Sequence, residues 1–347
     1  MKLTFLRDIY LFGMAIIHIL LYWAAARIHL NNNIWIFGSW FGNTYNDNSK
    51  YLFEYVNKNF PDITAVWISR NKDIIQRLQK RGFRAYYLHS LLGVWYAFRA
   101  GIVIFSVGYT SDLPGFCMAP SKKLIQLWHG AFLKKFGILN TKPQDTNQRI
   151  FPYIKNSTLT RWILRLYNKL FEADIRHVSH MDYKLEQYRK YTYITAISPI
   201  IKKEYIESFG IPKNQADKII ITGFPRNDAL FNDATGYSNQ IARTIKDIHQ
   251  SGGSVGFYLP THRREGEEEI LETIISNLKP YQDMMEAKKI YILIKLHQFH
   301  QKEITVEKLK NIIIVADKEI DDDVYPLLSM TDFLITDYSG IYFDYLL

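Results

Sequence analysis

Short apolar runs alternate with amphipathic stretches along the chain from residue 34 onward. Short apolar runs are typical of strands buried in a parallel sheet, and the stretches between them, such as 47–58 and 71–81, place apolar residues at helical spacing. The first runs predict strands at IWIFG (34–38), TAVWIS (64–69), RAYYLH (84–89), IVIFSV (102–107) and LIQLW (124–128). Strand and helix in alternation predict an α/β unit whose helices cover both faces of a parallel sheet.

A second series of the same kind begins near residue 195, after a mainly helical pattern over 153–193. Its predicted strands are KIIITG (218–223), VGFYLP (255–260), IYILIKLH (290–297), IIIV (312–315) and FLIT (333–336). The sequence therefore predicts two Rossmann-like parallel-sheet domains that face a cleft, one over 34–195 and one over 196–347. Neither carries a G-x-G-x-x-G pattern or a Walker A loop, so dinucleotide-binding and P-loop classes lack their fingerprints.

The last residue, Leu347, comes directly after the last predicted strand and the first residues of a helix. A doubly wound domain normally continues for at least one more strand and a closing helix. We therefore expect the domain over 196–347 to be incomplete.

Residues 9–26 form an apolar run, IYLFGMAIIHILLYWAAA, with cationic residues on either side. A membrane-spanning helix needs about 20 apolar residues, and this run is close to that length but contains His18 and several aromatic residues. We expect a membrane-associating helix within 1–33 that lies in or dips into the inner leaflet. The alternatives are a buried core helix and a cleaved signal peptide that ends at the alanines of 24–26.

The net charge of the chain indicates which class of partner it binds. The 347 residues include 43 lysines and arginines against 34 aspartates and glutamates, a formal charge of +9. Such a surplus favours polyanions: nucleic acid, anionic lipid headgroups or a phosphate-rich substrate. The sequence has neither zinc-finger spacing nor an aromatic–glycine RNA signature, so we expect no nucleic-acid partner. The single cysteine, Cys117, excludes an internal disulfide framework and a cysteine zinc cluster.

Polar residues directly after the apolar runs are the candidates for chemistry, because ligands of open parallel sheets bind beyond the carboxyl ends of the strands. His129 follows the run at 124–128 and precedes Gly130. An imidazole at a strand end can act as a general base near neutral pH, and the alternative is a hydrogen-bonded loop histidine. Arg226 follows the run at 218–223 and suits a phosphate or carboxylate, unless it is a surface residue of a plain turn.

Basic and hydroxyl side chains also follow the next two predicted strands. The hydroxyl of Thr261 and the guanidinium of Arg263 suit a diphosphate, and the alternative is an exposed basic loop. Lys295 and His297 end the following strand, and the alternation of side chains along a strand points both to the same side. Histidine and arginine therefore recur at strand ends in both halves of the chain, which favours one cleft lined by both.

The last predicted strand is followed by Ser339 and Gly340, with Asp344 one helical turn later. The hydroxyl and backbone N–H groups at this helix start suit a phosphate, and Asp344 suits a substrate hydroxyl, although Ser339 is otherwise explained as an N-cap. An acidic run at 321–323 resembles a metal-binding motif, but a helix that starts near Val324 explains it better, because carboxylates stabilise helix amino-termini. We therefore expect no metal.

Taken together, these stretches resemble the CDP-glycerol glycerophosphotransferases that prime or polymerise wall teichoic acid in Gram-positive bacteria. The similar segments, in the family's order over residues 34–347, are FGSWFGNTYNDNSKYLFEYV (37–56), LWHGAFLKKFG (127–137), TGFPRNDAL (222–230), YLPTHRREG (258–266), KLH (295–297) and TDFLITDYSGIYFDY (331–345). The set is specific, whereas none of its members is specific alone. The resemblance implies a GT-B-like fold and transfer of glycerol phosphate from CDP-glycerol, with release of CMP.

The resemblance also implies roles for individual residues. His129 matches the family's proposed base, and His297 is the second residue that we assign to catalysis. The donor contacts carry over to Gly130, Ala131, Phe132, Leu133, Arg226, Pro260, Thr261, Arg263, Ser339, Gly340 and Asp344. Two positions depart from the family: Gly340 replaces a second serine, which removes one hydroxyl contact, and His262 replaces the usual aromatic residue before Arg263.

The implied partners are CDP-glycerol, a lipid-linked saccharide or glycerol-phosphate acceptor, and an anionic membrane surface, without a cofactor. We expect the acceptor to bind over 34–195, the donor to bind over 196–347, and the protein to lie peripherally on the cytoplasmic side of the cell membrane. Two alternatives remain. One is a transferase of the same fold that uses CDP-ribitol or a nucleotide sugar for a wall or capsule polymer. The other is an inactive remnant that binds the membrane and partner enzymes as a scaffold.

Overall fold

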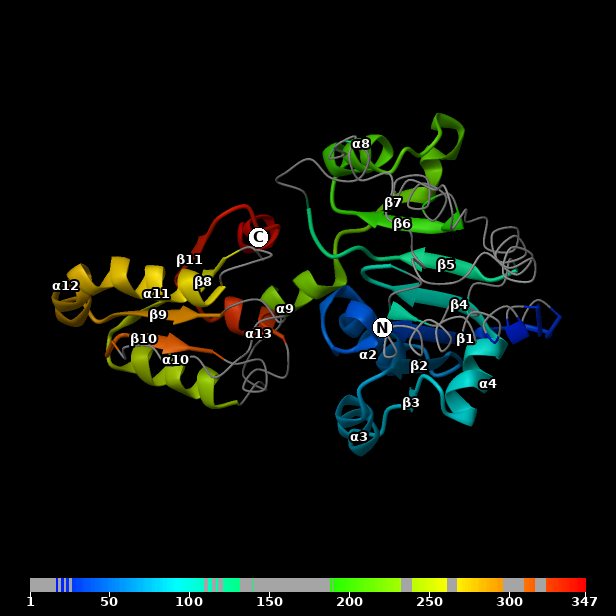
Figure 1. Cartoon of the computed structure of the whole chain (residues 1–347), viewed down its shortest axis with the longest axis horizontal. Coiled ribbons are helices and arrows are strands. Elements are labelled where there is room, and N and C mark those ends of the chain that lie inside the picture. Colours follow the sequence, from blue (N-terminus) through cyan, green and yellow to red (C-terminus); the bar gives the residue numbers. More distant parts are fainter. Residues whose placement is uncertain are drawn as a thin grey trace, which may run out of the picture. The chain divides into compact units, whose positions relative to one another are not determined.

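The computed structural model describes residues 27–108, 121–131, 190–231, 239–260, 267–295, 309–315 and 323–347, with a few single residues between these ranges. The chain divides into two compact units. Unit 1 takes Met1–His129 and Lys135–Pro225, and unit 2 takes Gly130–Lys134 and Arg226–Leu347. Each is an α/β unit built on a parallel sheet, as the sequence predicts (Figure 1).

A seven-stranded parallel sheet forms the centre of unit 1, in the order β3-β2-β1-β4-β5-β6-β7. The strands are β1 (Asn31–Gly38), β2 (Thr64–Ser69), β3 (Ala85–Tyr87), β4 (Ala100–Phe105), β5 (Lys123–Gln126), β6 (Tyr193–Ala196) and β7 (Ile219–Ile221). The five runs predicted as the first strands are confirmed as β1 to β5, with the predicted bounds for β2 and shifted ends for the other four.

The boundary between the units lies later in the chain than the 195/196 position that the sequence predicts. The sequence predicts that the run at 218–223 belongs to the second domain, but its strand β7 pairs with β6 through Ile194 and Ile219. In turn, β6 pairs with β5 through Ile125 and Tyr193. Buried apolar strands of two parallel sheets look alike in sequence, so the pattern does not reveal which sheet a strand joins.

Helices cover both faces of the unit 1 sheet. They are α2 (Asp47–Asn59), α3 (Lys72–Lys80), α4 (Leu91–Arg99) and α8 (Pro199–Ser208), with 3₁₀ turns η1 (Trp40–Gly42), η5 (Lys213–Lys218) and η6 (Pro225–Asn227). Phe53 of α2 and Leu78 of α3 share a buried core with Trp67 of β2, so these two helices lie on one face. The connection through α4 reverses direction along the sheet, and right-handed crossovers place it on the opposite face.

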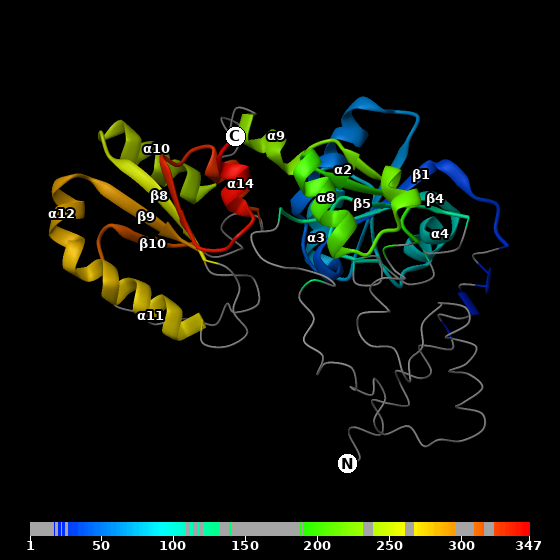
Figure 2. The ribbon, with the colours of Figure 1, turned by 90° about the horizontal axis from the view of Figure 1, so that it is seen from above.

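Unit 2 contains a four-stranded parallel sheet in the order β10-β9-β8-β11. Its strands are β8 (Ser254–Leu259), β9 (Ile290–Ile294), β10 (Ile312–Ile314) and β11 (Phe333–Thr336). Its helices are α9 (Asp228–Phe231), α10 (Gln240–Gln250), α11 (Glu267–Leu278), α12 (Gln282–Ala287), α13 (Tyr325–Leu328) and α14 (Ile341–Tyr345), with the 3₁₀ turn η8 (Lys279–Tyr281). Figures 1 and 2 show α10 on one face of the sheet and α11 on the other.

Most of the predicted membrane-associating segment lies outside the described residues, as does most of the predicted helical segment at 153–193. The strand β1 begins at Asn31, so the end of the segment predicted over 1–33 belongs to the sheet. Within the described residues, no helix combines the length and the apolar character that crossing a membrane requires.

The strand order of unit 1 has a switch point between β1 and β4. After β1 the chain adds β2 and β3 on one side, and β4 then pairs with the other side of β1. Ligands of open α/β sheets bind at the carboxyl ends of the strands at such a point. Gly38, Phe105 and Gln126 are aligned across β1, β4 and β5, so the segments that follow these strands start side by side.

Gly38 provides a test of this packing at the carboxyl end of β1. A Cβ at Gly38 would lie 2.8 Å from the side chain of Leu113 and 2.9 Å from the carbonyl oxygen of Asp112. We expect Gly38→Ala to lower the free energy of unfolding by about 1–3 kcal/mol through overpacking, measured by urea denaturation of the full chain. A urea midpoint equal to that of the wild type would contradict the close approach.

Candidate functional site

His129 lies at the carboxyl edge of the unit 1 sheet, directly after β5. The backbone N–H of Leu127 donates to the carbonyl of Phe105 at 2.9 Å, which extends the pairing with β4 beyond the end of β5. The Nδ1 atom of His129 lies 3.3 Å from the carbonyl oxygen of Ser106. A carbonyl oxygen only accepts hydrogen bonds, so Nδ1 carries the proton of the neutral ring and Nε2 carries the lone pair. This tautomer makes Nε2 the basic atom of the ring.

Trp128 turns the chain immediately before His129. Its φ of 60° lies in the left-handed region, which costs a residue other than glycine about 1–3 kcal/mol. The side chain is only 2% exposed, and its indole packs against the rings of Tyr188, Tyr205 and Phe209 at centroid distances of 6.4, 5.9 and 4.8 Å. The imidazole of His129 stacks on the same indole at 4.4 Å. The buried indole therefore fixes both the turn and the ring that follows it.

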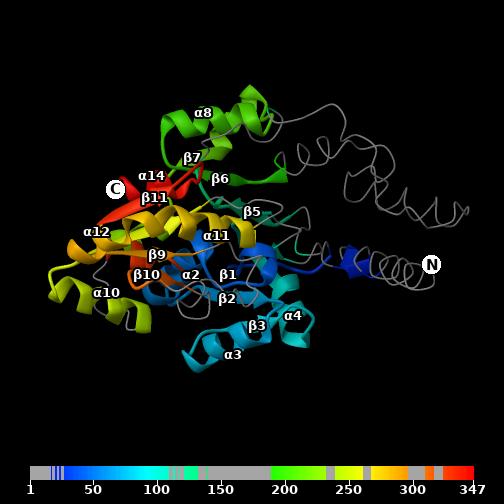
Figure 3. The same ribbon diagram turned by 60° about the vertical axis from the view of Figure 1, so that its left-hand side comes forward.

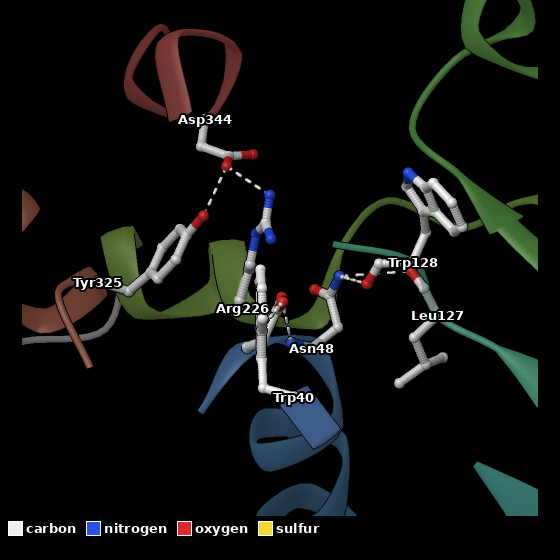
Figure 4. Close-up of polar contacts among 8 residues, drawn as sticks. Trp40, Asn48, Leu127, Trp128, Arg226, Tyr325 and Asp344 are labelled. Atoms are coloured by element: carbon white, nitrogen blue, oxygen red, sulfur yellow. Dashed lines mark hydrogen bonds and ion pairs between the residues drawn. The ribbon is translucent and has the colours of Figure 1, made fainter. Parts of the chain in front are cut away.

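Asn48, in the first turn of α2, ties this turn to the rest of unit 1 (Figure 4). Its Nδ2 donates to the carbonyl oxygens of Trp128 at 2.9 Å and Leu127 at 3.3 Å. The hydroxyl of Thr195, from β6, donates to the same carbonyl of Leu127 at 2.8 Å. The side chain of Asn48 is fully buried, and leaving a buried polar group without its hydrogen bond costs about 1–3 kcal/mol. These bonds hold the strained turn in place.

The segment after β1 reaches the same edge in an equally unusual conformation. The indole Nε1 of Trp40 donates to Oδ2 of Asp47 at 2.8 Å, and the Trp40 ring lies edge-on to the ring of His129 at 5.4 Å. In the described part of the chain, five residues other than glycine have positive φ, and four of them lie here: Trp40, Phe41, Asp47 and Trp128. Strained backbone clusters at functional sites because the surroundings must hold it there, so this edge is the strongest candidate for chemistry in unit 1.

Asp112 fastens the loops after β1 and β4 to one another. Its Oδ1 accepts from the N–H of Phe41 at 2.9 Å, and its Oδ2 accepts from those of Ser106 at 3.0 Å and Val107 at 2.8 Å. The carboxylate is 1% exposed, and these donors compensate for its burial. The Ser106 carbonyl that contacts His129 is thereby held in position as well.

In unit 2, Arg226 and Asp344 form a buried ion pair. Nη2 of Arg226 lies 2.7 Å from Oδ2 of Asp344, and the two side chains are 4% and 1% exposed. The hydroxyl of Tyr325 donates to the same oxygen at 2.7 Å, and the guanidinium lies over the Tyr325 ring at 5.0 Å (Figure 4). The sequence predicts that Asp344 accepts from a substrate hydroxyl, whereas here it orients Arg226. Removing one partner of an ion pair this deeply buried strongly destabilises the fold, because the other charge is left buried without compensation.

Close packing against Gly340 accounts for glycine at this position, where the family pattern has a serine. A Cβ at this position would lie 2.8 Å from the carbonyl oxygen of Ala131, which is closer than packed atoms tolerate. A Cβ on Gly130 would lie 3.7 Å from Nη2 of Arg226. Glycine at 340 therefore lets the backbone of Gly130 and Ala131 lie against the start of α14, a position that a serine would obstruct.

The structure brings together some of the predicted site residues and leaves others undescribed. Those grouped in unit 2 are Gly130, Ala131, Arg226, Gly340 and Asp344. Pro260 and Ser339 follow the paired strands β8 and β11 at the carboxyl edge of the second sheet. His129 ends the first segment of unit 1. Those outside the described residues are Phe132, Leu133, Thr261, His262, Arg263 and His297.

The acidic run at 321–323 is described only at Asp323. Its Oδ1 accepts from the N–H of Tyr325 at 3.1 Å, at the start of α13. This contact agrees with the role at a helix start that the sequence predicts. Within the described residues, no group of three or more histidines, cysteines, aspartates or glutamates is arranged to hold a metal ion.

The sequence does not predict the buried residues that hydrogen-bond to the candidate site and support it. Asp47 and Asn48 belong to a polar run at the start of a predicted helix. Both are buried in the structure, but a polar run in the sequence does not reveal burial. Tyr325 and Thr195 carry no signal in the sequence either, because each acts on a residue far away in the chain.

Comparison with known proteins gives one consistent family. A family model described as CDP-Glycerol:Poly(glycerophosphate) glycerophosphotransferase matches residues 20–347. The chain is 24% identical over 327 residues to a teichoic acid poly(glycerol phosphate) polymerase of Staphylococcus epidermidis, which covers 89% of this chain and 38% of that protein. It is also 24% identical over 324 residues to a teichoic acid glycerol-phosphate transferase of Staphylococcus aureus, covering 91% of this chain and 72% of that one.

A relative named for ribitol phosphate matches as well. The teichoic acid ribitol-phosphate polymerase TarK of Staphylococcus aureus is 29% identical over 237 residues, which cover 65% of this chain and 37% of that protein. This chain therefore spans well under half the length of the S. epidermidis and TarK polymerases.

The fold is shared with a solved structure of the wall teichoic acid polymerase TagF. The match has a TM-score of 0.65 and 19% sequence identity, and it covers 99% of this chain and 77% of that one. The GT-B-like α/β fold with parallel sheets that the sequence predicts is thereby confirmed.

Asn48 gives a test of the site's internal support. We expect Asn48→Ala to lower the free energy of unfolding by about 1–3 kcal/mol, because it removes the donor to two buried carbonyls. The matched control is Asn57→Ala in the same helix, where Nδ2 donates to the Phe53 carbonyl at 2.8 Å near the surface. The control is expected to change stability by less than about 0.5 kcal/mol. Equal urea midpoints for the two variants would contradict the supporting role of Asn48.

Proposed function

Because its residues 20–347 match the family model, the chain belongs to the CDP-glycerol:poly(glycerophosphate) glycerophosphotransferases, and we propose that it transfers glycerol phosphate from CDP-glycerol to an acceptor hydroxyl, releasing CMP. Within this structure, the observation that best supports the proposal is the hydrogen bonding of the His129 ring. Its Nδ1 is engaged by the Ser106 carbonyl at the carboxyl edge of a parallel sheet, which leaves Nε2 as the proton acceptor.

In the proposed reaction, Nε2 of His129 takes the proton of the acceptor hydroxyl as the oxygen attacks the glycerol-bearing phosphorus of CDP-glycerol. A new P–O bond forms to the acceptor, the P–O bond to CMP breaks, and CMP leaves with the electron pair. General base catalysis of this kind contributes about 10²- to 10⁴-fold to a rate. The Ser106 carbonyl stabilises the imidazolium that forms, because it accepts from the protonated Nδ1.

Phosphoryl transfer depends chiefly on positioning and on charge stabilisation. We assign the diphosphate of the donor to Arg226, with Arg263 and His297 as the family resemblance implies. Asp344 balances the charge of Arg226 at 2.7 Å, so Arg226 contributes directed N–H donors more than net positive charge. Tyr325 and Asp344 are positioning residues in this assignment, because they act through Arg226.

The proposed acceptor is a lipid-linked saccharide or glycerol-phosphate terminus, and the proposed location is the cytoplasmic side of the cell membrane. The formal charge of +9 favours an anionic leaflet. The apolar run at 9–26 supports peripheral attachment there. An acceptor that is held in the same leaflet would be presented at high effective concentration.

CDP-ribitol is the second candidate donor, since a relative named for ribitol phosphate is 29% identical over 237 residues. The two donors carry the same cytidine diphosphate and differ only in the length of the polyol. The residues that we assign to the reacting phosphate would therefore serve both donors, and a competition between CDP-glycerol and CDP-ribitol for CMP release decides which is used.

The proposed base predicts the effect of one substitution. We expect His129→Ala to lower CMP release from CDP-glycerol, measured with a lipid-linked glycerol-phosphate acceptor, by at least about 100-fold. The matched control is His249→Ala in α10 of unit 2. The side chain of His249 is 36% exposed, and its Nε2 lies 3.0 Å from Oδ2 of Asp332. The control is expected to keep wild-type turnover.

Two outcomes would contradict the proposal. Wild-type turnover by a folded His129→Ala protein would remove the base assignment. Failure of the folded wild type to release CMP from either CDP-polyol would favour the scaffold alternative, in which the chain binds partners without catalysis.

A further inference from the structure

Helix α4 exposes three large apolar side chains on the surface of unit 1. Leu91, Leu92 and Trp95 are 92%, 54% and 50% exposed. Residues three and four apart lie on one side of a helix, so Trp95 extends the surface that the two leucines begin. These three residues are named the α4 patch. Large contiguous apolar patches mark protein–protein or membrane interaction sites, so the α4 patch is a candidate for such a site.

The α4 patch is held in a fixed position by the rest of unit 1. At the amino-terminus of α4, the hydroxyl of Ser90 accepts from the N–H of Gly93 at 3.0 Å, and Gly93 packs directly against the carbonyl of Tyr87. At the carboxyl-terminus, the buried ammonium of Lys122 donates to the carbonyls of Ala97 and Phe98. Both ends of the helix are therefore anchored, and the apolar side chains cannot turn inward without breaking these contacts.

The chain segment that carries the α4 patch is rich in cationic residues. Residues 70–99 contain one acidic residue, Asp73, and the following basic ones: Arg70, Lys72, Arg77, Lys80, Arg81, Arg84 and Arg99. All of these cations except Arg99 are on exposed residues. Figures 1 and 3 show α3, β3 and α4 together at one end of the seven-stranded sheet, where β3 is the edge strand. Apolar and cationic side chains thus share one end of unit 1.

We propose that this end of unit 1 is a docking surface for an anionic lipid bilayer. The α4 patch enters the boundary between headgroups and acyl chains, and the surrounding lysines and arginines contact the lipid phosphates. Leucine and tryptophan next to clustered cations are the composition of interfacial membrane contacts. A polyanion in water would engage only the cations and would leave Leu91 and Leu92 exposed, so the bilayer is the partner that satisfies both kinds of side chain.

The inference rests on the proposed membrane location and adds a folded contact to the apolar segment at 9–26. Two contacts matter physically, because a single weak anchor gives only marginal and reversible membrane binding. A second contact on a rigid element also fixes the orientation of unit 1 relative to the leaflet.

The test is flotation of the full chain with vesicles of phosphatidylglycerol and phosphatidylcholine, without donor or acceptor. We expect Leu91→Ser/Leu92→Ser to lower the partition coefficient by about ten-fold or more, because it removes two inserted aliphatic side chains without changing charge. The matched control, Ile200→Ser/Ile221→Ser, removes aliphatic side chains that are 72% and 48% exposed elsewhere in unit 1, and it is expected to bind as the wild type does. Circular dichroism checks that each variant is folded.

A charge variant tests the cationic part of the proposed docking surface. We expect Arg84→Gln to weaken binding to phosphatidylglycerol vesicles about five-fold and to leave binding to pure phosphatidylcholine unchanged. Equal partition of the leucine variant and the wild type, or equal losses in the leucine variant and its control, would overturn the proposal. So would tight binding of the wild type to RNA without binding to anionic vesicles. CMP release, assayed separately, reports the proposed reaction, so failure of docking and failure of catalysis are distinguishable.

Discussion

The hydrogen bonds that buried Asn48 donates to the carbonyls of Leu127 and Trp128 support the part of unit 1 that the backbone itself disfavours. Trp128 sits in the left-handed region at φ 60°, and a turn of that kind persists only where several contacts over-determine it. Its consequence is the placement of His129, whose Nδ1 then meets the carbonyl of Ser106 at 3.3 Å. The proton-accepting Nε2 of the proposed base is thus a result of packing and hydrogen bonding behind it.

The topology of the sheet explains why these contacts meet where they do. The reversal of strand order at β1 and β4 opens the carboxyl edge at that point, and Asp112 ties together the loops that leave it. In unit 2 a functional side chain is likewise fixed by buried partners. Arg226 is held by the carboxylate of Asp344 and the ring of Tyr325. In each unit a reactive or charged side chain is fixed by buried partners rather than by the solvent-facing surface.

Periodicity in the sequence predicts ten of the strands, because a buried parallel strand leaves a compact apolar run that few other elements produce. It misses β6 (Tyr193–Ala196), where Thr195 interrupts the apolar run. Motif resemblance predicts His129, Arg226 and Asp344 as site residues, but it does not predict their contacts. Those contacts join residues far apart in the chain, 80 positions for Asn48 and Trp128 and 118 for Arg226 and Asp344. Only the folded arrangement reveals that Asp344 serves Arg226 and that Gly340 makes room for Ala131.

In the proposed mechanism, the Ser106 carbonyl sets the tautomer of His129 and so makes Nε2 the base. The most direct measurement is the ¹⁵N NMR spectrum of ring-labelled histidine in the full chain, recorded where the ring is neutral, with the signal assigned by its loss in His129→Gln. We expect the shifts of a ring that is protonated at Nδ1 and unprotonated at Nε2. A ring protonated at Nε2 would contradict the proposed role of His129, because that atom would then have no lone pair with which to accept the proton of the acceptor hydroxyl.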